Sequence, residues 1–484
     1  MSLRKVANVV GLLQVFVALS MFLTGLVAIG YGDGDARGLF VAGAITLFVG
    51  WALYLTTRFD EDVTIREGFA IVTMSWTTTA IFGSLPYLLT GTIEAPTQAI
   101  FEAMSGFTTT GATVFSDVEA LPHGILLWRS VTHWLGGMGI IVLVIAVLPY
   151  LGVGGMQLFR AEVPGPTPER LRPRIAQTAK LLWLVYFGLT AVLAGLYLLG
   201  GMGPFDAVNH SFSTLATGGF STRNTSMAQM SPFIQWVTIL FMYLAGVNYA
   251  LHFRAATGRL DYFKDEEWKF FTLVLIFATV VIVALNLVQG SHAAFEPALR
   301  DSLFQVLAIT TTTGYVSADY ELWVPGSRMV LFALFFVGGM AGSTSGGIKT
   351  LRVMLLLKQT GNELRKHLHP RAVFVTRIGT TPVKEEVITR VVSFVILYLL
   401  LCLVGAIALG FTGIDPLTAI GGSIASVGNV GPSFAGLGPT DNYGWMSSPA
   451  LAVLSFLMLV GRLEIYTVLL LFHPELWKAR GSFH

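Results

Sequence analysis

Four short stretches combine threonine with glycine in a chain that is otherwise strongly apolar. They read FTTTGAT at 107–113, LATGGFS at 215–221, TTTTGYV at 310–316 and SVGNVGPSF at 426–434. Threonine is a poor helix former, and a glycine in a helix interior costs about 1 kcal/mol relative to alanine. The stretches therefore predict backbone that leaves the helix and turns its carbonyl oxygens inward. A ring of such oxygens replaces the hydration shell of a bare monovalent cation.

The four stretches recur at a long and nearly regular period, which indicates repetition of a whole supersecondary unit. Their aligned glycines are Gly111, Gly218, Gly314 and Gly431. Each glycine follows a proline by 14 to 17 residues, and these prolines are Pro96, Pro204, Pro297 and Pro416. Because proline suits the first turn of a helix, we expect a short helix to begin near each proline and to end at the glycine loop.

The short helices must enter the membrane and return. A helix of about 12 residues is roughly 18 Å long, which is about half a bilayer. Non-helical backbone at that depth is tolerated only where protein buries it or where it lines a watery path. Four such loops on one axis would direct the negative carboxyl ends of their helices at a central cavity. A packing kink explains a single stretch of this kind, but not four copies between pairs of spans.

The elements that would position these loops are membrane spans. Of 484 residues, 54% are hydrophobic and 12% are charged, about half the charge of a soluble domain. Ten charge-free runs are each long enough to cross a hydrocarbon core of about 30 Å. The runs are 7–30, 38–57, 68–91, 130–159, 181–205, 224–253, 270–295, 329–348, 391–414 and 442–461. The sequence predicts a multi-pass membrane protein whose first run is a retained span rather than a signal peptide.

The distribution of positive charge predicts the orientation. Of 30 Lys and Arg, two lie at membrane depth, Lys349 and Arg462, and five fall on one side of the ten predicted spans. Those five are Arg37, Arg129, Arg223, Arg300 and Arg328, which leaves 23 on the other side. Since cytoplasmic loops carry the excess of Lys and Arg, we expect both termini and the segments 160–180 and 349–390 to be cytoplasmic.

Several chemistries find no support in the residue types. The lone Cys402 excludes a disulfide within the chain and is best explained as a small packed hydrophobe. Within the predicted spans there is no H-E-x-x-H and no pair of aspartates, so an intramembrane enzyme is not favoured. We expect no enzymatic activity, no cofactor on this chain and no nucleic-acid partner.

The combination of motifs resembles the Trk/Ktr/HKT superfamily of potassium-translocating subunits, over essentially the whole chain. The resemblance rests on the four loops, on GSTSGGIK at 342–349 and on GRLEIYT at 461–467. Two extra amino-terminal spans are most similar to the TrkH branch. The resemblance implies an all-α integral membrane protein with four span–pore helix–filter loop–span repeats around a central pore. It also implies potassium conduction, a homodimer and a cytoplasmic ring of TrkA type that carries the nucleotides.

The selectivity-filter prediction takes residues from all four loops. The set is Thr109, Thr110, Gly111, Thr217, Gly218, Thr312, Thr313, Gly314, Asn429, Val430 and Gly431. We expect backbone oxygens of Thr110 with Gly111, Thr217 with Gly218, Thr313 with Gly314, and Val430 with Gly431 to bind K⁺. In the family a serine at the first filter glycine accompanies sodium selectivity, so Gly111 is consistent with potassium. The fourth loop departs most from the pattern because it lacks the threonine.

A gate is predicted below the filter, where GGMAGSTSGGIKT at 338–350 would break any helix. The predicted gate residues are Gly342, Ser343, Thr344, Ser345, Gly346, Gly347, Lys349 and Arg462. Close helix packing through small-xxx-small spacing is the alternative for the glycines. An arginine at the bilayer centre costs about 2.5–3.5 kcal/mol on insertion scales. Arg462 should therefore be either a positive barrier to cations beneath the filter or the partner of a buried carboxylate.

The basic segments 160–180 and 349–390 have three interpretations that the sequence leaves open. They are solvated positive-inside loops, sites for anionic lipid, or the docking surface for a regulatory ring. His367 and His369 belong to this polar surface and are not expected to bind a metal. No G-x-G-x-x-G follows a strand-like run, so no nucleotide site is expected on this chain.

The leading hypothesis is selective, gated potassium uptake across the cytoplasmic (inner) membrane of a bacterium or archaeon. The alternative is a secondary transporter that couples K⁺ to H⁺ or Na⁺, which would favour two-fold repeats and intramembrane carboxylates. The expected domains are two extra spans and four pore repeats, with the gating loop in the third. Their boundaries are 1–66, 67–160, 161–258, 259–365 and 366–484.

Overall fold

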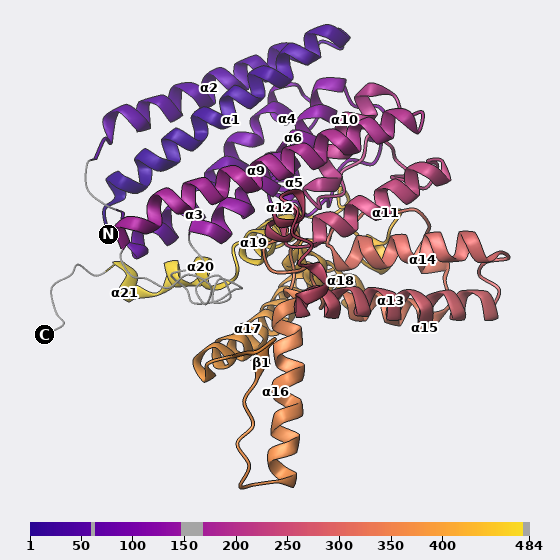
Figure 1. Cartoon of the computed structure of the whole chain (residues 1–484). Helices are drawn as coiled ribbons and strands as arrows, with labels where there is room; N and C mark the ends of the chain where they lie inside the picture. The colour runs from indigo at the N-terminus through magenta and orange to yellow at the C-terminus, as the bar shows by residue number, and fades with distance from the viewer. Residues whose placement is uncertain (60–62, 147–167, 478–484) are drawn as a thin grey trace, which may run out of the picture.

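The computed structural model describes residues 1–59, 63–146 and 168–477. Within these residues the fold consists of helices and one two-stranded hairpin (Figure 1). Six helices are long and apolar enough to cross a membrane, and up to eight spans result if each of two bent helix pairs counts as one. The predicted all-α integral membrane fold is confirmed.

The amino-terminal hairpin consists of α1 (Leu3–Tyr31) and α2 (Ala36–Thr56), which lie side by side at one edge of the bundle (Figure 1). The two helices approach closely at glycines. A Cβ added at Gly11 or at Gly50 would lie less than 3.0 Å from the carbonyl oxygen of the other. The connection between them reaches the next unit, because Asp33 accepts a hydrogen bond from the His123 amide at 2.8 Å.

The rest of the described chain follows the predicted order of span, short helix, loop and second span, four times. The first repeat contains α3 (Ile65–Gly83), α4 (Leu85–Leu89), α5 (Pro96–Phe107) and α6 (His123–Ala146). The second contains α9 (Pro168–Leu199), α10 (Pro204–Leu215), α11 (Pro232–Gly246) and α12 (Tyr249–Ala256). The third contains η1 (Tyr262–Lys264), α13 (Glu266–Val288), α14 (Phe295–Thr310), η2 (Tyr320–Leu322), α15 (Pro325–Leu334) and α16 (Thr350–Leu368).

The fourth repeat and the carboxyl-terminal end complete the bundle. They contain α17 (Glu385–Gly410), α18 (Pro416–Gly428), η3 (Ala435–Leu437), α19 (Ser448–Arg462), α20 (Tyr466–Leu469), η4 (Leu470–Phe472) and α21 (Pro474–Trp477). The expected boundary between the third and fourth repeats, after residue 365, falls inside α16, which continues to Leu368.

The short helices begin largely as their prolines predict. Proline is the first residue of α5, α10 and α18, where its missing N–H needs no partner. In the third repeat α14 begins at Phe295, two residues before Pro297. Ahead of α18, Asp415 caps the helix by accepting hydrogen bonds from the amides of Leu417 and Thr418, both at 3.1 Å.

The second span of three repeats is broken rather than continuous. The axis bends by 103° between α11 and α12 and by 110° between α19 and the turn that begins at Tyr466. In the third repeat α15 ends at Leu334 and α16 starts only at Thr350. The charge-free runs 224–253 and 329–348 therefore contain breaks that hydropathy does not detect, and the bend after α19 lies just beyond the end of the run 442–461. The run 130–159 is helical to Ala146, and its remainder lies outside the described residues.

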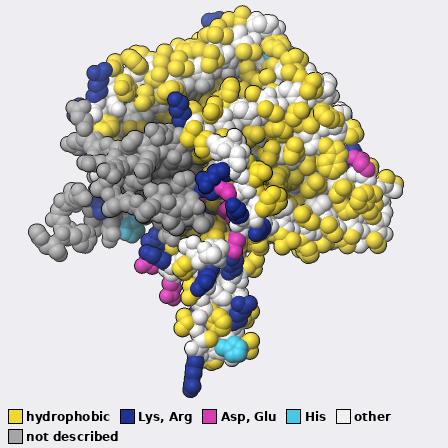
Figure 2. All heavy atoms as spheres, viewed as in Figure 1, with side chains coloured by type: hydrophobic (Ala, Val, Ile, Leu, Met, Phe, Trp, Pro, Cys, Tyr) yellow, Lys and Arg dark blue, Asp and Glu magenta, His cyan; other side chains and the backbone are white. Residues whose placement is uncertain are grey.

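An arm projects from the bundle (Figure 1). It consists of α16 and the hairpin of β1 (Arg377–Ile378) and β2 (Thr381–Pro382), in which Arg377 pairs with Pro382. Lys and Arg side chains gather along the arm and where it joins the bundle, whereas apolar side chains cover much of the bundle (Figure 2). Of the expected cytoplasmic segment 160–180, residues 160–167 lie outside the described residues.

Candidate ion-binding site

The four loops share one backbone conformation. In each, a non-glycine residue with positive φ is followed two positions later by a glycine with positive φ. The pairs are Thr109 (53°) and Gly111 (82°), Thr217 (53°) and Gly219 (84°), Thr312 (57°) and Gly314 (70°), and Asn429 (55°) and Gly431 (93°). Asn429 thus occupies the place of the threonines, since asparagine tolerates this conformation. The fourth loop keeps the predicted register.

The second loop requires a correction. The left-handed glycine equivalent to Gly111 is Gly219, whereas the alignment took Gly218. Because Gly218 and Gly219 are adjacent, the sequence allows two registers. The Thr217-Gly218 pair favours the register that is one residue too early. Proline spacing would have decided it, because Gly219 follows Pro204 by 15 residues, as Gly111 follows Pro96. Gly218 stays in the loop, one position before the left-handed glycine.

The loops pack against one another in a closed ring. A Cβ added at any left-handed glycine would lie less than 3.0 Å from a carbonyl oxygen of the next loop. Gly111 faces the oxygen of Gly218, and Gly219 faces that of Thr313. Gly314 faces the oxygen of Val430, and Gly431 faces that of Thr110. The cycle runs through repeats one, two, three and four and returns to one.

Four carbonyl oxygens therefore lie at equivalent positions of four adjoining loops. They belong to Thr110, Gly218, Thr313 and Val430, each the residue before a left-handed glycine. All four residues are buried. Only glycine fits after each of them, because the next position combines a positive φ with a neighbouring backbone that leaves no room for a side chain.

Side-chain hydrogen bonds hold the threonines of the loops in place. The hydroxyls of Thr108 and Thr110 lie 2.8 Å apart, and those of Thr311 and Thr313 lie 2.7 Å apart. In the fourth loop Asn429 donates from Nδ2 to the Thr110 hydroxyl at 3.0 Å. The Asn429 amide thus links the fourth loop to the first, whereas each hydroxyl pair lies within one loop.

Four buried side-chain oxygens of the loop stretches have no hydrogen-bond partner among the described residues. They are the hydroxyls of Thr109, Thr310 and Ser426 and Oδ1 of Asn429. Since a buried polar atom without a partner costs free energy, such oxygens are suited to a bound cation or its water.

The broken segment of the third repeat lies directly against the loops. Gly346 donates its backbone N–H to the Thr312 hydroxyl at 2.7 Å. Thr344 donates its hydroxyl to the carbonyl oxygens of Leu215 at 3.0 Å and Ala245 at 3.3 Å. The predicted gate residues Ser343, Thr344 and Ser345 are all buried. The segment 338–350 therefore fills space among the second, third and fourth repeats.

The amino-terminal part of this segment is tied to the bend in the second repeat. Met340 donates its N–H to the Gly246 carbonyl at 2.9 Å, and Tyr249 donates its N–H to the Gly342 carbonyl at 3.1 Å. Gly342 and Gly347 have φ values of 80° and 66°, which require glycine. The 103° bend between α11 and α12 thus supplies backbone partners that a continuous helix would not expose.

Arg462 contacts the predicted gate rather than a carboxylate. Its Nη1 donates to the Thr344 carbonyl at 2.7 Å and its Nη2 to the Gly136 carbonyl at 3.4 Å. Among the described residues Arg462 forms no ion pair, and Glu464 pairs with Arg352 instead. Of the two interpretations made from the sequence, the geometry favours an unpaired positive charge that holds the gate segment against the first repeat.

The other side of the segment is held by Lys349 and by Glu267, a carboxylate that the sequence analysis does not identify. The Lys349 amine donates to the Ser345 carbonyl. Oε1 of Glu267 accepts the N–H groups of Ala341 at 2.7 Å and Leu351 at 3.0 Å, one from each end of the segment. The signal that could have found Glu267 is an acidic residue at the start of a charge-free span.

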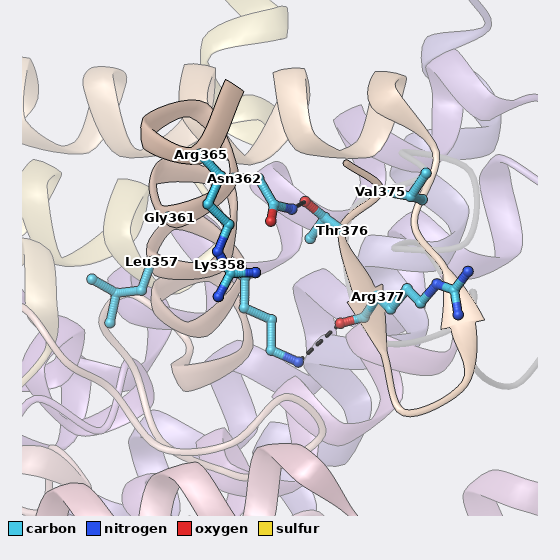
Figure 3. A pocket seen from close by; sticks show the side chains of 8 residues that line it. All are labelled: Leu357, Lys358, Gly361, Asn362, Arg365, Val375, Thr376 and Arg377. Atoms are coloured by element: carbon cyan, nitrogen blue, oxygen red, sulfur yellow. Dashed lines mark hydrogen bonds between the residues drawn. The ribbon is translucent and has the colours of Figure 1, made fainter. Parts of the chain in front are cut away.

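The arm carries a basic cavity of about 340 Å³ between α16 and the hairpin (Figure 3). Lys358, Arg365 and Arg377 are among its lining residues. Lys358 is held in place, because its amine donates to the Arg377 carbonyl at 2.9 Å (Figure 3). The same amine lies 2.5 Å from Oε2 of Glu266. Both histidines of the arm are exposed, and no group of potential metal ligands occurs among the described residues.

Polar residues join the first two loops at their outer limbs, by which we mean the residues that directly follow the left-handed glycine. Asn224 donates to Asp117 at 2.8 Å and accepts the Val118 N–H at 2.6 Å. The hydrogen bond from Asn224 lowers the pKa of the Asp117 carboxyl, which keeps it ionised. The negative charge at this position is therefore present at neutral pH.

Four repeats around a closed ring of loops, within a helical bundle that spans the membrane, define a multi-pass membrane transport protein. The model of the TrkH family, described as cation transport protein, matches residues 38–479. The chain belongs to the TrkH family, and the resemblance drawn from the motifs is confirmed. The family consists of transporters rather than enzymes, as expected.

Relatives of the chain carry related names. It is 40% identical over 491 residues to the Trk system potassium uptake protein TrkH of Salmonella typhimurium, covering 99% of this chain and all of that one. It is 35% identical to the Trk system potassium uptake protein TrkI of Halomonas elongata, covering 98% and 96%. The crystal structure of the potassium transporter TrkH from Vibrio parahaemolyticus matches with a TM-score of 0.91 and 37% identity, covering 99% and 100%.

Proposed function

We propose that this chain takes up K⁺ across the cytoplasmic membrane through a selective, gated pore. The observation that carries the proposal is the closed cycle of four loops, in which each left-handed glycine abuts a carbonyl oxygen of the next loop. Carbonyl oxygens from four equivalent positions can replace the water around a monovalent cation. The names of similar proteins, which include potassium uptake and potassium transport, support K⁺ as the transported ion.

The filter residues are proposed as predicted, with Gly219 added. K⁺ would be coordinated by the backbone oxygens of Thr110, Gly218, Thr313 and Val430 and by neighbouring oxygens of the same loops. The hydrogen bonds among Thr108, Thr110 and Asn429 would fix the threonine side chains beneath.

Closure of the pore is assigned to residues 338–350. Filter oxygens select an ion but do not close a path, and this segment lies against the loops of the second, third and fourth repeats. Arg462 adds a positive charge that opposes a cation on the same side. The five glycines of the segment lower the cost of rearranging its backbone.

Control would come from a cytoplasmic nucleotide-binding ring of TrkA type that docks on the basic arm. The arm leads directly from the gate segment through α16, so a force on it would reach Lys349 and Thr350. We also propose a homodimer, with both termini on the cytoplasmic side of the inner membrane. The exposed Leu357, Leu364 and Leu368 on the arm favour a protein contact there.

Unitary current recording from purified protein in a planar bilayer tests the pore. With K⁺ on one side and Na⁺ on the other, single-channel steps with a reversal potential set by K⁺ are expected. Flux without unitary steps, driven by an H⁺ or Na⁺ gradient, would instead favour the secondary transporter. Two buried carboxylates, Glu102 and Glu464, do not favour that alternative, because each is paired with an arginine, whereas the buried Glu267 accepts backbone N–H groups.

A further inference from the structure

A buried ion pair lies behind the first two filter loops. Glu102 on α5 and Arg129 on α6 meet at 2.9 Å between Oε1 and Nε, and their side chains are 0% and 2% exposed. Charge counting placed Arg129 among the external arginines, but its side chain lies inside the protein. Burying two charges is expensive, so a pair in this position must be stabilised by further hydrogen bonds.

Those hydrogen bonds go to the outer limbs of two different loops. On the first loop, Glu102 accepts the Val114 N–H at 2.9 Å and the Thr113 hydroxyl at 3.0 Å. On the second loop, Arg129 donates from Nη1 to the Ser221 carbonyl at 3.1 Å. The pair therefore connects residues that follow Gly111 and Gly219 by two or three positions.

Aromatic contacts extend the connection to the ring itself. The guanidinium of Arg129 lies 4.1 Å from the centre of the Phe220 ring. His133, one helical turn further along α6, stacks on the same Phe220 ring at 4.1 Å between centres. A Cβ added at Gly218 would lie less than 3.0 Å from this imidazole. Arg129, Phe220 and His133 thus form a continuous support behind the residue whose carbonyl enters the ring.

The same position differs in every repeat. The residue nine places before the left-handed glycine is Glu102, His210, Gln305 and Gly422 in turn. His210 lies 2.9 Å from the Ser221 hydroxyl, and Gln305 donates to the Ser317 hydroxyl at 3.4 Å. Glycine offers no side chain for such a bond. Among these four positions only the first carries a charge, and only that side chain forms an ion pair.

We propose that the Glu102–Arg129 pair is a positioning element that determines ion specificity, by fixing the distance between the first and second filter loops. The inference rests on the proposed function of these loops as the filter. Coordination of a cation by carbonyl oxygens depends on their spacing, and this pair joins the limbs that hold the oxygens of Thr110 and Gly218. Loosening it lets the two oxygens separate or approach, so that Na⁺ competes better with K⁺.

The decisive variants change the geometry of the pair in different ways. Arg129→Lys keeps the positive charge, but a single ammonium nitrogen cannot reach acceptors that three guanidinium nitrogens span. Glu102→Gln keeps the shape and an acceptor oxygen but removes the negative charge. The double variant Glu102→Gln with Arg129→Gln removes both charges and leaves no uncompensated ion in the interior.

Arg223→Gln serves as the matched control. Arg223, which follows the second filter loop, also pairs with a carboxylate, because its Nη2 lies 2.8 Å from Oδ2 of Asp206 on α10, but its side chain is 49% exposed. This control removes an arginine on the outer side without touching the Glu102–Arg129 pair, so it reports any effect of charge alone.

The measurement is the K⁺ to Na⁺ permeability ratio from bi-ionic reversal potentials of purified protein. We expect the ratio to fall about tenfold in Arg129→Lys and in the double variant, with K⁺ current retained, and to stay unchanged in Arg223→Gln. A wild-type ratio in a folded Arg129→Lys or double variant overturns the proposal. So does failure of all three pair variants to fold, since the pair would then serve assembly rather than the filter.

A filter variant separates this inference from the proposed function. If Gly111→Ser lowers the permeability ratio while the pair variants do not, the filter assignment stands and only the role of the ion pair is wrong. If Gly111→Ser itself leaves the ratio unchanged, the assignment of the loops fails, and the inference fails with it.

Discussion

At the scale of single residues, the candidate filter is defined by where a side chain cannot be tolerated. The four left-handed glycines each face a backbone oxygen of the neighbouring loop, so a Cβ would require the backbone to shift. Positive φ adds strain for any other residue. Loop geometry at these positions is therefore sensitive to the smallest substitution available.

We expect Gly111→Ser to lower discrimination between K⁺ and Na⁺ by about tenfold, the change that about 1.4 kcal/mol produces. The added Cβ would collide with the Gly218 carbonyl and displace it from the ring. Bi-ionic reversal potentials measure the effect. Gly201→Ala is a suitable control, because Gly201 has a similar φ of 88° but open space around its Cβ position. Equal losses in both variants would assign the effect to backbone strain alone.

Arg462 gives a second prediction at this scale. Arg462→Ala removes a buried positive charge and the bond to the Thr344 carbonyl, so cation flux should rise. A reduction of about 1.4 kcal/mol in the barrier corresponds to about a tenfold increase. Flux of ⁸⁶Rb⁺ or K⁺ into proteoliposomes checks it, with Arg462→Lys as a charge-preserving control. A stable alanine variant with wild-type flux would contradict the barrier role.

At the scale of elements, the breaks in the second spans are what allow the gate segment to exist. Residues 335–349 lie between α15 and α16, and their backbone partners come from the bend of the second repeat and from Glu267. A movable element needs two backbone arrangements between which it can switch. The glycines of the segment widen the range of backbone angles open to it.

Deleting residues 342–347 should raise flux and weaken its dependence on the cytoplasmic partner. The deletion removes Thr344 and Gly346, which make the contacts to Leu215 and Thr312. The measurement is K⁺ flux with and without the partner, on protein whose dimeric state is checked by size-exclusion chromatography. A folded dimer with unchanged, fully controlled flux would mean that the glycines serve packing only.

Glu267 offers a milder test of the same element. Glu267→Ala leaves the Ala341 and Leu351 N–H groups without their buried acceptor, a loss of about 1–3 kcal/mol. Partner-independent flux should therefore rise severalfold. Glu267→Gln retains an oxygen that can accept both bonds and should behave like the wild type. Identical behaviour of the two variants would exclude hydrogen bonding as the cause.

The sequence predicted the elements better than their connections. Proline and glycine spacing located the four short helices, and helix-breaking composition located the gate segment, because both are local properties. The bend within 224–253 escaped, because this run carries no charge and the partners of its backbone, Met340 and Gly342, come from the third repeat. The bend between Arg462 and Tyr466 lies just beyond the run 442–461. The Glu102–Arg129, Glu267–Leu351 and Arg352–Glu464 contacts span 27, 84 and 112 residues, so no local pattern indicates them.

At the scale of the whole molecule, the proposed orientation in the membrane rests on the distribution of charge. The arm and its base carry a concentration of Lys and Arg on one side of the bundle (Figure 2). The positive-inside rule assigns that side to the cytoplasm. The filter loops and the arm would then face opposite compartments.

Cysteine labelling tests this orientation. In a Cys402→Ala background, Lys366→Cys on the arm should react with an impermeant maleimide only after cells are permeabilised. Glu94→Cys, in the exposed turn before α5, should react in intact cells. Cys402→Ala removes the one native thiol and, because alanine is smaller, adds no atoms to the packed interior around this buried position. Labelling of residue 366 in intact cells would reverse the topology.

The ring of four loops belongs to one polypeptide, and this has a genetic consequence. In a pore formed by identical subunits, one codon change alters the same position in every filter loop. Here each loop is encoded separately, so the Asn429 amide, the Glu102–Arg129 pair and the Thr311–Thr313 hydroxyl pair stand in different repeats around one ring. A single mutation therefore changes one of the four filter loops and leaves the other three as they were. Ion preferences intermediate between two symmetric filters become accessible in this way, whereas a channel of identical subunits changes all four loops together.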